Sequence, residues 1–401
     1  MRAREPPGEG GCARRRPSRG GGPADQGAPV IVTAEVVIAG GGTGGHTSPG
    51  LAVAALLRER SISCAWIGSR SGIEAQRVPQ TGIPYVAIST GKLRRYWAWQ
   101  NVGDLAVNVP MGMLGAVRAL RALRPKVVLG TGGFVALPVM FAAAVSRVPI
   151  VLHEQTAVPG LANRIGARFA RRIAVTFPDR TGSFPAARVV VTGNPLRPEL
   201  RAGSRSSAIA RFQLDPAVPL VYVTGGALGA HRINRVVGEA LPALLAHAQI
   251  IHQCGENPTT GDRPWLEERR AALPSSLARR YTVVPYVGAE LAEIYAAAAL
   301  AVARAGAGTV NECCQLGVPA LYVPLPGTSG DEQTANARLV ERAGGAGVLP
   351  QSMLTAERLE REVLALVSDP ARLKQMGERA RTLAVSDAAE RIVAVLTEFC
   401  R

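Results

Sequence analysis

Short apolar runs alternate with longer segments of helical periodicity from residue 35 to about residue 191. The runs are rich in β-branched residues, and the segments between them repeat apolar positions every three or four residues. Strands are expected at residues 36–39, 65–67, 85–88, 127–129, 150–152, 173–175 and 189–191. Because helices separate these strands, the pattern predicts an α/β fold with a parallel sheet covered by helices.

The same pattern starts again after a break. Residues 192–198 contain two prolines, and a polar stretch rich in Ser and Arg follows them. A new strand, glycine turn and helix begin at Pro219, and further strands are expected at residues 249–253, 282–285, 300–303 and 320–324. The chain is therefore predicted to form two doubly wound halves, residues 34–197 and 198–385, each opening with a glycine loop.

The first glycine loop follows the first strand directly and is predicted to bind a phosphate. Backbone N–H groups of such a loop, together with the positive end of the next helix, form an anion site. Ser48 is expected to cap that helix and Pro49 to occupy its first turn. His46 comes directly after the glycines, where an imidazole suits proton transfer, although a histidine that only caps backbone groups is the alternative.

Gly40, Gly42 and Gly45 also fit the G-x-G-x-x-G pattern of dinucleotide-binding folds. A nicotinamide or flavin enzyme of that kind places an acidic residue at the end of its second strand, where it binds a ribose. Here the second strand runs into Gly68, Ser69 and Arg70 instead. The missing acid weighs against an oxidoreductase.

The second half carries another candidate anion site. Gly306 and Gly308 allow backbone amides to approach a ligand, and Thr309 is expected to open a helix. Thr309 and Glu312 have the spacing of a capping box, so Glu312 either completes that cap or accepts hydrogen bonds from vicinal hydroxyls such as those of a ribose. The polar cluster that contains Gln333 and Asn336 suits a sugar, or is a solvated loop.

Composition restricts the partners and the compartment. The 401 residues carry a formal net charge of +16, almost all of it from Arg, which suggests an anionic partner. The six cysteines lack metal-binding or C-x-x-C spacing and are expected to be reduced thiols in a cytosolic protein. The longest apolar stretch is too short to cross a bilayer, and residues 1–33 are predicted to be a disordered basic tail.

A segment rich in Arg and Trp follows the third expected strand. Arg94, Arg95, Trp97 and Trp99 lie within six residues of one another. Aromatic rings interleaved with cations suit a bilayer interface, where the rings lie at headgroup level and the cations meet anionic lipid. The alternative is a pair of tryptophans packed under a loop, beside a solvated helix face.

Six motifs in order along the chain resemble the MurG family of N-acetylglucosaminyltransferases, which is part of glycosyltransferase family 28. The motifs are G-T-G-G-H-x-x-P-G-L-A at 42–52, G-T-G-G at 130–133, H-E-Q at 153–155, G-N-P-L-R at 193–197, the Gly225-Gly226 loop and G-A-G-T-V-x-E at 306–312. The resemblance covers the chain from residue 35 to its C-terminus. It implies a GT-B fold, two Rossmann-like domains facing across a cleft, with a final helix at 386–401 that packs back onto the first domain.

The resemblance also implies the substrates. The donor is UDP-N-acetylglucosamine, and the acceptor is the undecaprenyl-pyrophosphoryl N-acetylmuramoyl-pentapeptide, whose 4-hydroxyl receives the sugar to give the lipid precursor of peptidoglycan. Such an enzyme works at the cytoplasmic face of the bacterial inner membrane, as a peripheral protein on an anionic lipid surface, and has no nucleic-acid partner.

By the same resemblance, Gly306 to Thr309 and Arg197 face the diphosphate, Glu312 the ribose, Val287 the uracil, and Gln333 with Asn336 the sugar. The loop around Thr43 would meet the acceptor pyrophosphate and the donor sugar. The substrate-binding residues so implied are Thr43, Gly44, Gly45, Thr156, Arg197, Val287, Gly306, Ala307, Gly308, Thr309, Val310, Glu312, Gln333 and Asn336. Two positions depart from the family: Thr156 stands where Asn is frequent, and Ala227-Leu228 where Ser-Gln is frequent.

Sugar transfer needs a base for the acceptor hydroxyl and fixed positive potential for the leaving diphosphate. His46 is the predicted base, with Glu154 as a substitute or orienting partner, and Arg197 with the helix start at Thr309 stabilises the leaving group. No acidic metal-binding triad is visible, so transfer without a metal or other cofactor is expected. The rival predictions are a UDP-sugar 2-epimerase, another lipid glycosyltransferase and a non-catalytic nucleotide-sugar sensor.

Overall fold

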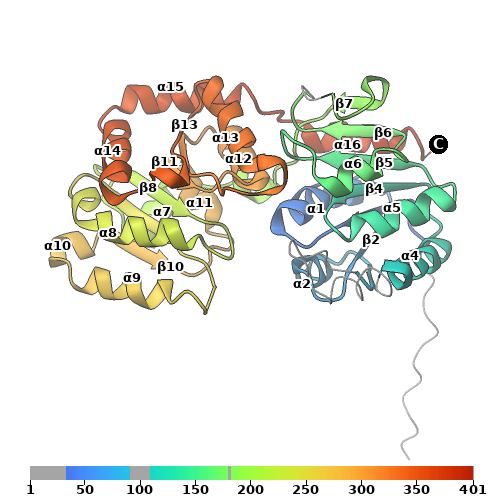
Figure 1. Cartoon of the computed structure of the whole chain (residues 1–401), viewed down its shortest axis with the longest axis horizontal. Coiled ribbons are helices and arrows are strands. Elements are labelled where there is room, and N and C mark those ends of the chain that lie inside the picture. Colours follow the sequence, from blue (N-terminus) through green and yellow to red (C-terminus); the bar gives the residue numbers. More distant parts are fainter. Residues whose placement is uncertain (1–32, 91–108, 179–181, 401) are drawn as a thin grey trace, which may run out of the picture.

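The computed structural model describes residues 33–90, 109–178 and 182–400. These residues form two α/β lobes joined side by side, with the first half of the chain in one lobe and most of the second half in the other (Figure 1). The predicted tail at 1–33 lies outside the described residues except for its last position. In the described part of the chain, no helix is long and apolar enough to cross a membrane.

The N-terminal sheet has seven described parallel strands in the order β3-β2-β1-β4-β5-β6-β7. The strands are β1 (Val36–Gly40), β2 (Cys64–Ser69), β3 (Tyr85–Ile88), β4 (Val127–Gly132), β5 (Ile150–Glu154), β6 (Arg172–Val175) and β7 (Val189–Val191). The helices are α1 (Gly44–Glu59), α2 (Ile73–Gln80), α4 (Val109–Leu123), α5 (Ala136–Val145) and α6 (Leu161–Gly166). All seven strands predicted from the apolar runs are present.

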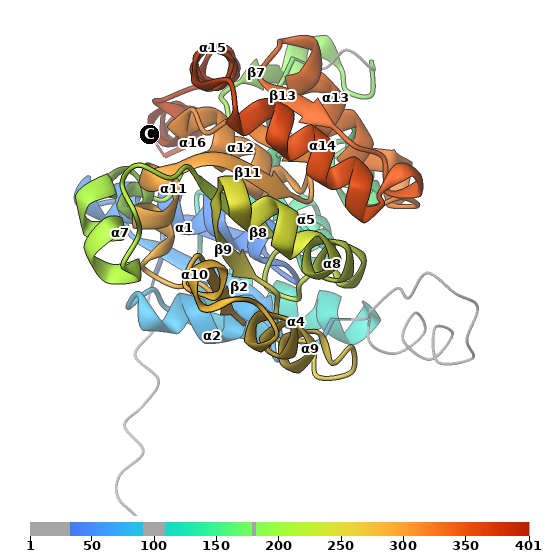
Figure 2. The same ribbon diagram turned by 90° about the vertical axis from the view of Figure 1, so that its left-hand side faces the viewer.

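The C-terminal sheet has six described parallel strands in the order β10-β9-β8-β11-β12-β13. The strands are β8 (Leu220–Thr224), β9 (Gln249–Gln253), β10 (Tyr281–Val284), β11 (Ala298–Ala303), β12 (Ala320–Tyr322) and β13 (Ala346–Val348). The helices are α7 (Arg205–Phe212), α8 (His231–His247), α9 (Asp262–Ala271), α10 (Ser275–Ala278), α11 (Leu291–Ala297), α12 (Ala307–Leu316), α13 (Glu332–Arg342), α14 (Ala356–Val367) and α15 (Pro370–Arg381). Seen from this side, α8 and α14 cover one face of the sheet together (Figure 2).

Each sheet is buried on both faces, because helices cover both. Among the described residues, one N-terminal core contains Val37, Ala39 and Ile67, and the other contains Ile38, Trp66 and Val53. The last helix, α16 (Ala388–Thr397), crosses back to the first lobe and places Ile392 and Leu396 in the second of these cores (Figure 1). The chain therefore connects the lobes twice, near residues 192–197 and near residues 382–387.

Trp66 explains how this packing shapes the first glycine loop. The indole is fully buried, and its Nε1–H donates to the carbonyl of Gly40, 3.0 Å away. A Cβ at Gly50 would lie 2.4 Å from the Trp66 ring, so only glycine allows α1 to pack this closely on the sheet. The end of β1 and the start of α1 are thus both fixed against one side chain.

Candidate functional site

His46 lies in the first turn of α1, and its ring rests against the end of β4. The helix begins at Gly44 with Thr43 as its N-cap, so the predicted cap at Ser48 is wrong, and the Thr43 hydroxyl accepts from the N–H of His46 at 3.4 Å. His46 Nδ1 lies 3.1 Å from the carbonyl oxygen of Thr131, which can only accept. The proton of a neutral ring is therefore assigned to Nδ1, and Nε2 keeps its lone pair.

The environment of His46 also favours the neutral ring. Desolvation lowers the pKa of His46 below its usual value of 6.5, although the negative charge of Glu154 and the hydrogen bond to Thr131 oppose that shift. A neutral imidazole with a free Nε2 can accept a proton at neutral pH. This geometry suits the base that was predicted from the sequence.

The buried carboxylate of Glu74 holds the loop in front of His46. One oxygen accepts from the N–H of Gly42 at 2.8 Å, and the other accepts from the N–H and the hydroxyl of Ser69 at 3.1 and 2.5 Å. A Cβ at Gly41 would lie 2.2 Å from the carboxyl carbon of Glu74. Sequence analysis missed this residue, although an acid in the first turn of the helix after β2 was the available signal.

Glu154 at the end of β5 is fully engaged with its own loop. Its carboxylate accepts from the N–H and hydroxyl of Thr156 at 2.9 and 2.8 Å, from Asn163 Nδ2 at 2.9 Å and from the N–H of Gly160 at 3.3 Å. The Thr156 hydroxyl has a single hydrogen, which points either to Glu154 or to the carbonyl of Val158. This arrangement favours a positioning role for Glu154, and the Thr156 side chain serves the loop.

The second predicted anion site is the N-terminus of α12. The helix begins at Ala307 with Gly306 as N-cap and no side-chain cap, so the predicted capping box of Thr309 and Glu312 does not form. A Cβ at Gly306 or at Gly308 would meet nothing within 4 Å, and Gly306 has φ −66°, which any residue adopts. The fold itself does not require these glycines, and without side chains they leave room for a ligand to approach the backbone.

Val310 is the exception within this motif. Its side chain is buried in the core, and its N–H donates to the carbonyl of Gly306 at 3.0 Å. Val310 therefore packs the helix rather than presenting a polar group to a ligand.

Arg197 and Glu312 lie beside this helix start. Arg197 Nη2 is 3.8 Å from Glu312 Oε1, which is beyond hydrogen-bond distance, while Tyr295 donates to Glu312 Oε2 at 2.9 Å. Burial raises the pKa of Glu312, and the nearby Arg197 charge and the Tyr295 hydrogen bond act against that rise.

The two helix starts face one another across the cleft between the lobes. A narrow space there is lined by Gly45 and Ser48 of α1 and by Gly308 and Glu312 of α12, with Arg197 beside them. Gly45 and Ser48, which flank His46 in the sequence, line the same space as Arg197 and Glu312. The structure brings the two predicted anion sites together.

Of the residues predicted to bind the uracil and the sugar, Asn336 contacts the first lobe directly, and Val287 lies next to a residue that does. Asn336 accepts from the N–H of Ala157 in the first lobe at 2.9 Å and donates to the carbonyl of Ala305 at 3.2 Å. Val287 is buried beside Tyr286, whose hydroxyl contacts Arg77 of α2 across the cleft. Gln333 accepts from the N–H of Leu325 at 3.0 Å, so its amide nitrogen is turned away from that bond.

The loop at Ala227-Leu228 pairs two of its backbone N–H groups internally. The N–H groups of Gly226 and Gly229 are bonded within the loop, to the hydroxyl of Thr224 and the carbonyl of Gly226. Leu228 is 77% exposed.

The predicted membrane residues Arg94, Arg95, Trp97 and Trp99 lie outside the described residues. The described cysteines are free thiols.

Comparison with known proteins adds a family to this geometry. Residues 36–175 match the N-terminal domain model of glycosyltransferase family 28, and residues 220–392 match its C-terminal domain model. A UDP-N-acetylglucosamine–N-acetylmuramyl-(pentapeptide) pyrophosphoryl-undecaprenol N-acetylglucosamine transferase of Nocardioides sp. is 40% identical and aligns over 91% of this chain and 98% of the relative. A transferase of the same name from Halorhodospira halophila is also 40% identical, over 90% and 98%.

Solved structures show the same fold. MurG of Acinetobacter baumannii superposes with a TM-score of 0.69 at 29% identity, covering 91% of this chain and 99% of that one. UDP-GlcNAc 2-epimerase of Neisseria meningitidis superposes with a TM-score of 0.62 at 13% identity, over 90% and 99%, which shows likeness of fold alone.

Proposed function

The chain belongs to glycosyltransferase family 28, and from that premise we propose that it transfers N-acetylglucosamine from UDP-N-acetylglucosamine to the 4-hydroxyl of a lipid-linked N-acetylmuramoyl-pentapeptide. The acceptor is the undecaprenyl-pyrophosphoryl form named for the curated relatives. The observation that carries the proposal is the meeting of two glycine-lined helix N-termini at one cleft. One cradles the diphosphate of the donor, and the other meets the pyrophosphate of the acceptor.

The donor is held mainly by the C-terminal lobe. Arg197 and the uncapped start of α12 face the diphosphate, Glu312 accepts from the ribose hydroxyls, and Val287 borders the uracil. Gln333 and Asn336 contact the sugar, and Asn336 also bridges the lobes. The open space around Gly306 and Gly308 supports this assignment, because a phosphate oxygen needs to approach the backbone there.

The chemistry begins at His46. Nε2 takes the proton from the acceptor hydroxyl, the hydroxyl oxygen forms a bond to the anomeric carbon, and the bond from that carbon to the UDP oxygen breaks. The leaving diphosphate receives its developing charge beside Arg197 and the α12 N-terminus. In-line attack on the α-linked donor inverts the anomeric carbon and gives a β-linked product.

We assign the charge stabilisation to the chain's own groups, so the transfer requires no metal or other cofactor. Excess chelator is expected to leave the rate unchanged. A rate that falls with chelator and returns with Mg²⁺ would contradict this part of the proposal.

A bilayer surface is the expected partner of the α4–α5–α6 face, defined here as Met111, Leu114, Phe134, Phe141, Val145, Leu161 and Phe169 with Arg147, Arg164, Arg168 and Arg171. The seven apolar side chains are all at least 38% exposed, and Phe141 packs edge-on against Phe169 with ring centroids 6.0 Å apart. The three helices contain no acidic residue. Apolar side chains beside Arg, on helices without acidic residues, suit an anionic membrane.

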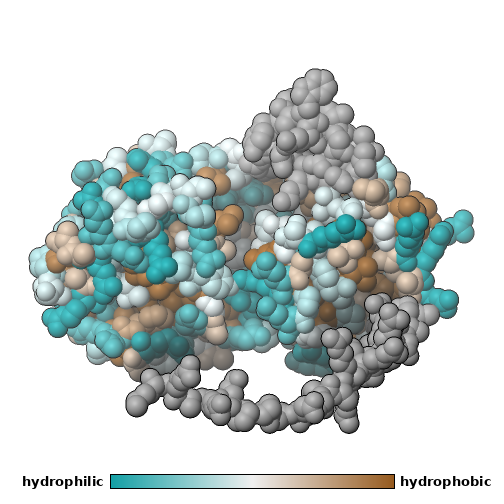
Figure 3. Space-filling view, turned by 90° about the horizontal axis from the view of Figure 1, so that it is seen from below, coloured by the Kyte–Doolittle hydropathy of each residue, from teal (hydrophilic) through white to brown (hydrophobic). Residues whose placement is uncertain are grey.

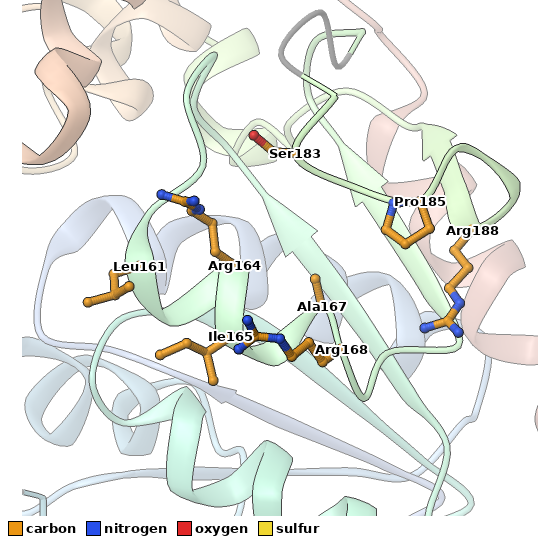
Figure 4. Close-up of a pocket in the computed structure, with 8 residues that line it drawn as sticks. All are labelled: Leu161, Arg164, Ile165, Ala167, Arg168, Ser183, Pro185 and Arg188. Atoms are coloured by element: carbon orange, nitrogen blue, oxygen red, sulfur yellow. The ribbon is translucent and has the colours of Figure 1, made fainter.

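A cavity of about 400 Å³ opens in this face, and the arginines that line it make the face more positive. Arg164 and Arg168 extend toward it from α6 and the residues just after, and Arg188 lies on its other side (Figure 4). Seen from below, the surface mixes hydrophilic and hydrophobic residues on both lobes (Figure 3). These features support the proposal that the enzyme works at the cytoplasmic face of the bacterial inner membrane, where a nucleotide sugar and a lipid acceptor are both accessible.

Radiolabel transfer tests the reaction itself. The chain is incubated with UDP-[¹⁴C]N-acetylglucosamine with and without the lipid-linked acceptor, and lipid and nucleotide-sugar fractions are separated. Label in the lipid, dependent on the acceptor, is the expected result. A C2 epimer of the donor formed without acceptor would instead indicate a 2-epimerase, and binding of the donor without any turnover would indicate a sensor.

Vesicle sedimentation tests the membrane face. Wild type is expected to sediment with vesicles rich in anionic phosphatidylglycerol, and Arg164→Glu/Arg168→Glu should weaken binding at least about tenfold, at roughly 1 kcal/mol per basic residue and with like-charge repulsion added. The matched control is Arg361→Glu/Arg372→Glu, which reverses two exposed arginines of α14 and α15. Equal loss in both double variants would point to net charge rather than to this face.

A further inference from the structure

We propose that Tyr295 is a positioning residue that fixes the Glu312 carboxylate for the donor ribose and keeps it away from Arg197. The proposal rests on the function proposed above. Among the described residues, one short hydrogen bond orients this carboxylate. The Tyr295 hydroxyl donates it to Glu312 Oε2.

The distance between Arg197 and Glu312 is too long for a hydrogen bond that would orient the carboxylate. Arg197 Nη2 lies 3.8 Å from Oε1, whereas a charge-assisted N–H···O bond is about 2.8 Å long. A carboxylate without the tyrosine would be free to rotate toward Arg197 and close that gap. The pair would then neutralise the guanidinium that faces the diphosphate and occupy the oxygen that faces the ribose.

Tyr295 is itself held firmly enough to act as this restraint. Its side chain is 4% exposed in the core between α11 and α12, and its ring packs edge-on against Tyr222 with centroids 5.6 Å apart. Tyr222 in turn donates to Gln253 Oε1 at 2.7 Å, and Gln253 Nε2 reaches the carbonyl of Gly226 at 3.4 Å. The contacts that hold Tyr295 in place therefore extend to the Gly225-Gly226 loop.

The tyrosine also remains a hydrogen-bond donor throughout the working pH range. Burial and the neighbouring Glu312 charge raise the pKa of Tyr295 well above its usual value, so the hydroxyl keeps its proton. A protonated hydroxyl offers one hydrogen, and Glu312 is the acceptor that the geometry gives it. With Glu312 held away from it, Arg197 binds the diphosphate, and Glu312 binds the ribose.

The test compares two donors with the full chain. Wild type and Tyr295→Phe are assayed with UDP-N-acetylglucosamine and with its 2′,3′-dideoxyribose analogue, which has no ribose hydroxyls. Tyr295→Phe keeps the ring and its stacking, and is expected to raise the KM for the natural donor about tenfold, the effect of losing a hydrogen bond to a charged group, with kcat nearly unchanged. The KM for the dideoxy analogue should change less than twofold.

Two further variants separate positioning from loss of structure. Tyr281→Phe removes a comparable buried hydroxyl, which contacts His252 Nδ1 at 2.9 Å at the far edge of the same sheet. It is expected to lower the Tm about as much as Tyr295→Phe while leaving the KM for both donors unchanged. Glu312→Gln should abolish the preference for the ribose donor, and Tyr295→Phe should add nothing in that background.

The outcomes distinguish this inference from the proposed function. A Tyr295→Phe variant that keeps the wild-type preference for the ribose donor overturns the role of Tyr295 while the transfer reaction stands. A wild type that transfers both donors equally well has the same consequence, because Glu312 would then make no ribose contact. A wild type that neither binds nor transfers N-acetylglucosamine from UDP overturns the proposed function itself.

Discussion

The N-termini of α1 and α12 are both glycine-lined helix starts at the same cleft, yet they are built differently. At α1 the loop is tied to the protein: Thr43 caps the helix, Glu74 holds the N–H of Gly42, and a Cβ at Gly40 would lie 1.9 Å from Thr131 Oγ1. At α12 the helix has no side-chain cap, and Gly306 and Gly308 face open space. The first start presents a fixed imidazole, and the second presents free backbone donors.

This difference teaches how a shared motif divides catalysis from binding. A base must be held in one orientation, and the α1 loop is tied to the protein by the Thr43 cap and by Glu74. A diphosphate site needs unpaired N–H groups and positive potential, so its helix start is left uncapped. Close packing requires Gly40 and Gly41 in the α1 loop, whereas a Cβ at Gly44, as at Gly306 and Gly308, would meet nothing within 4 Å.

The largest expected effect comes from the fixed imidazole. His46→Ala removes the proposed base and should lower kcat about 10²-fold while the KM for UDP-N-acetylglucosamine changes little, because the proposed donor site is at α12. Steady-state transfer of labelled sugar to the lipid acceptor measures both constants. His247→Ala, at an exposed position of α8, is the control and should match wild type. A fully active His46→Ala would remove the base role.

The next effect comes from the open glycines. Gly308→Ala adds a methyl group where the fold has room, so the Tm should not fall, while the KM for the donor should rise about tenfold because the methyl blocks close approach of a phosphate. Gly238→Ala is the contrasting control, since its Cβ would lie 2.3 Å from the Trp265 ring. That control should lower the Tm, and a Gly308→Ala variant with unchanged donor KM would contradict the diphosphate assignment.

A smaller effect is expected from the support of the α1 loop. Glu74→Gln supplies one acceptor oxygen where the carboxylate supplies two, and so leaves either the part-buried N–H of Gly42 or the buried N–H of Ser69 without its partner, at a cost of up to about 1–3 kcal/mol. We expect a lower free energy of unfolding in urea and a kcat/KM for the lipid acceptor reduced about fivefold. If the donor KM changes instead, the two helix starts are not separated in the way described.

The smallest effect is the response of wild type to acid. Because the pKa of His46 is lowered, the ring is still mostly neutral at pH 6.5, and only below that does protonation remove the base. The kcat for transfer at pH 6.5 should therefore exceed half of its plateau value and fall at lower pH. An acid limb with its midpoint above pH 7 would show that His46 is not the titrating base.

Much of the fold could be predicted because strand and helix periodicities are local. The apolar runs identified all strands of the first sheet, and β9 was predicted at its observed bounds. β13 was missed, since Ala-Gly-Val at 346–348 carries too weak a β signal and becomes a strand only by pairing with β12. Helix caps were also misjudged: Thr43, and not Ser48, caps α1 through its hydroxyl, and α12 begins after Gly306 with no side-chain cap.

The candidate site could be predicted where glycine and histidine motifs mark it, but not where partners come from distant segments. Glu74 is 32 residues from Gly42, and Tyr295 is 17 residues from Glu312, so neither pairing has a local sequence signature. The sequence also left open whether Glu312 caps a helix or faces a ligand. Its hydrogen bond to Tyr295 removes the capping alternative.

The central claim is that the donor diphosphate binds at the start of α12, with its sugar turned toward His46 on α1. A crystal structure of the chain with UDP-N-acetylglucosamine tests this most directly. The account predicts diphosphate oxygens about 3 Å from the N–H groups of Gly308 and Thr309, and the anomeric carbon on the side of the cleft that carries His46 Nε2. A diphosphate bound instead at the Gly225-Gly226 loop, with the sugar directed away from α1, would contradict it.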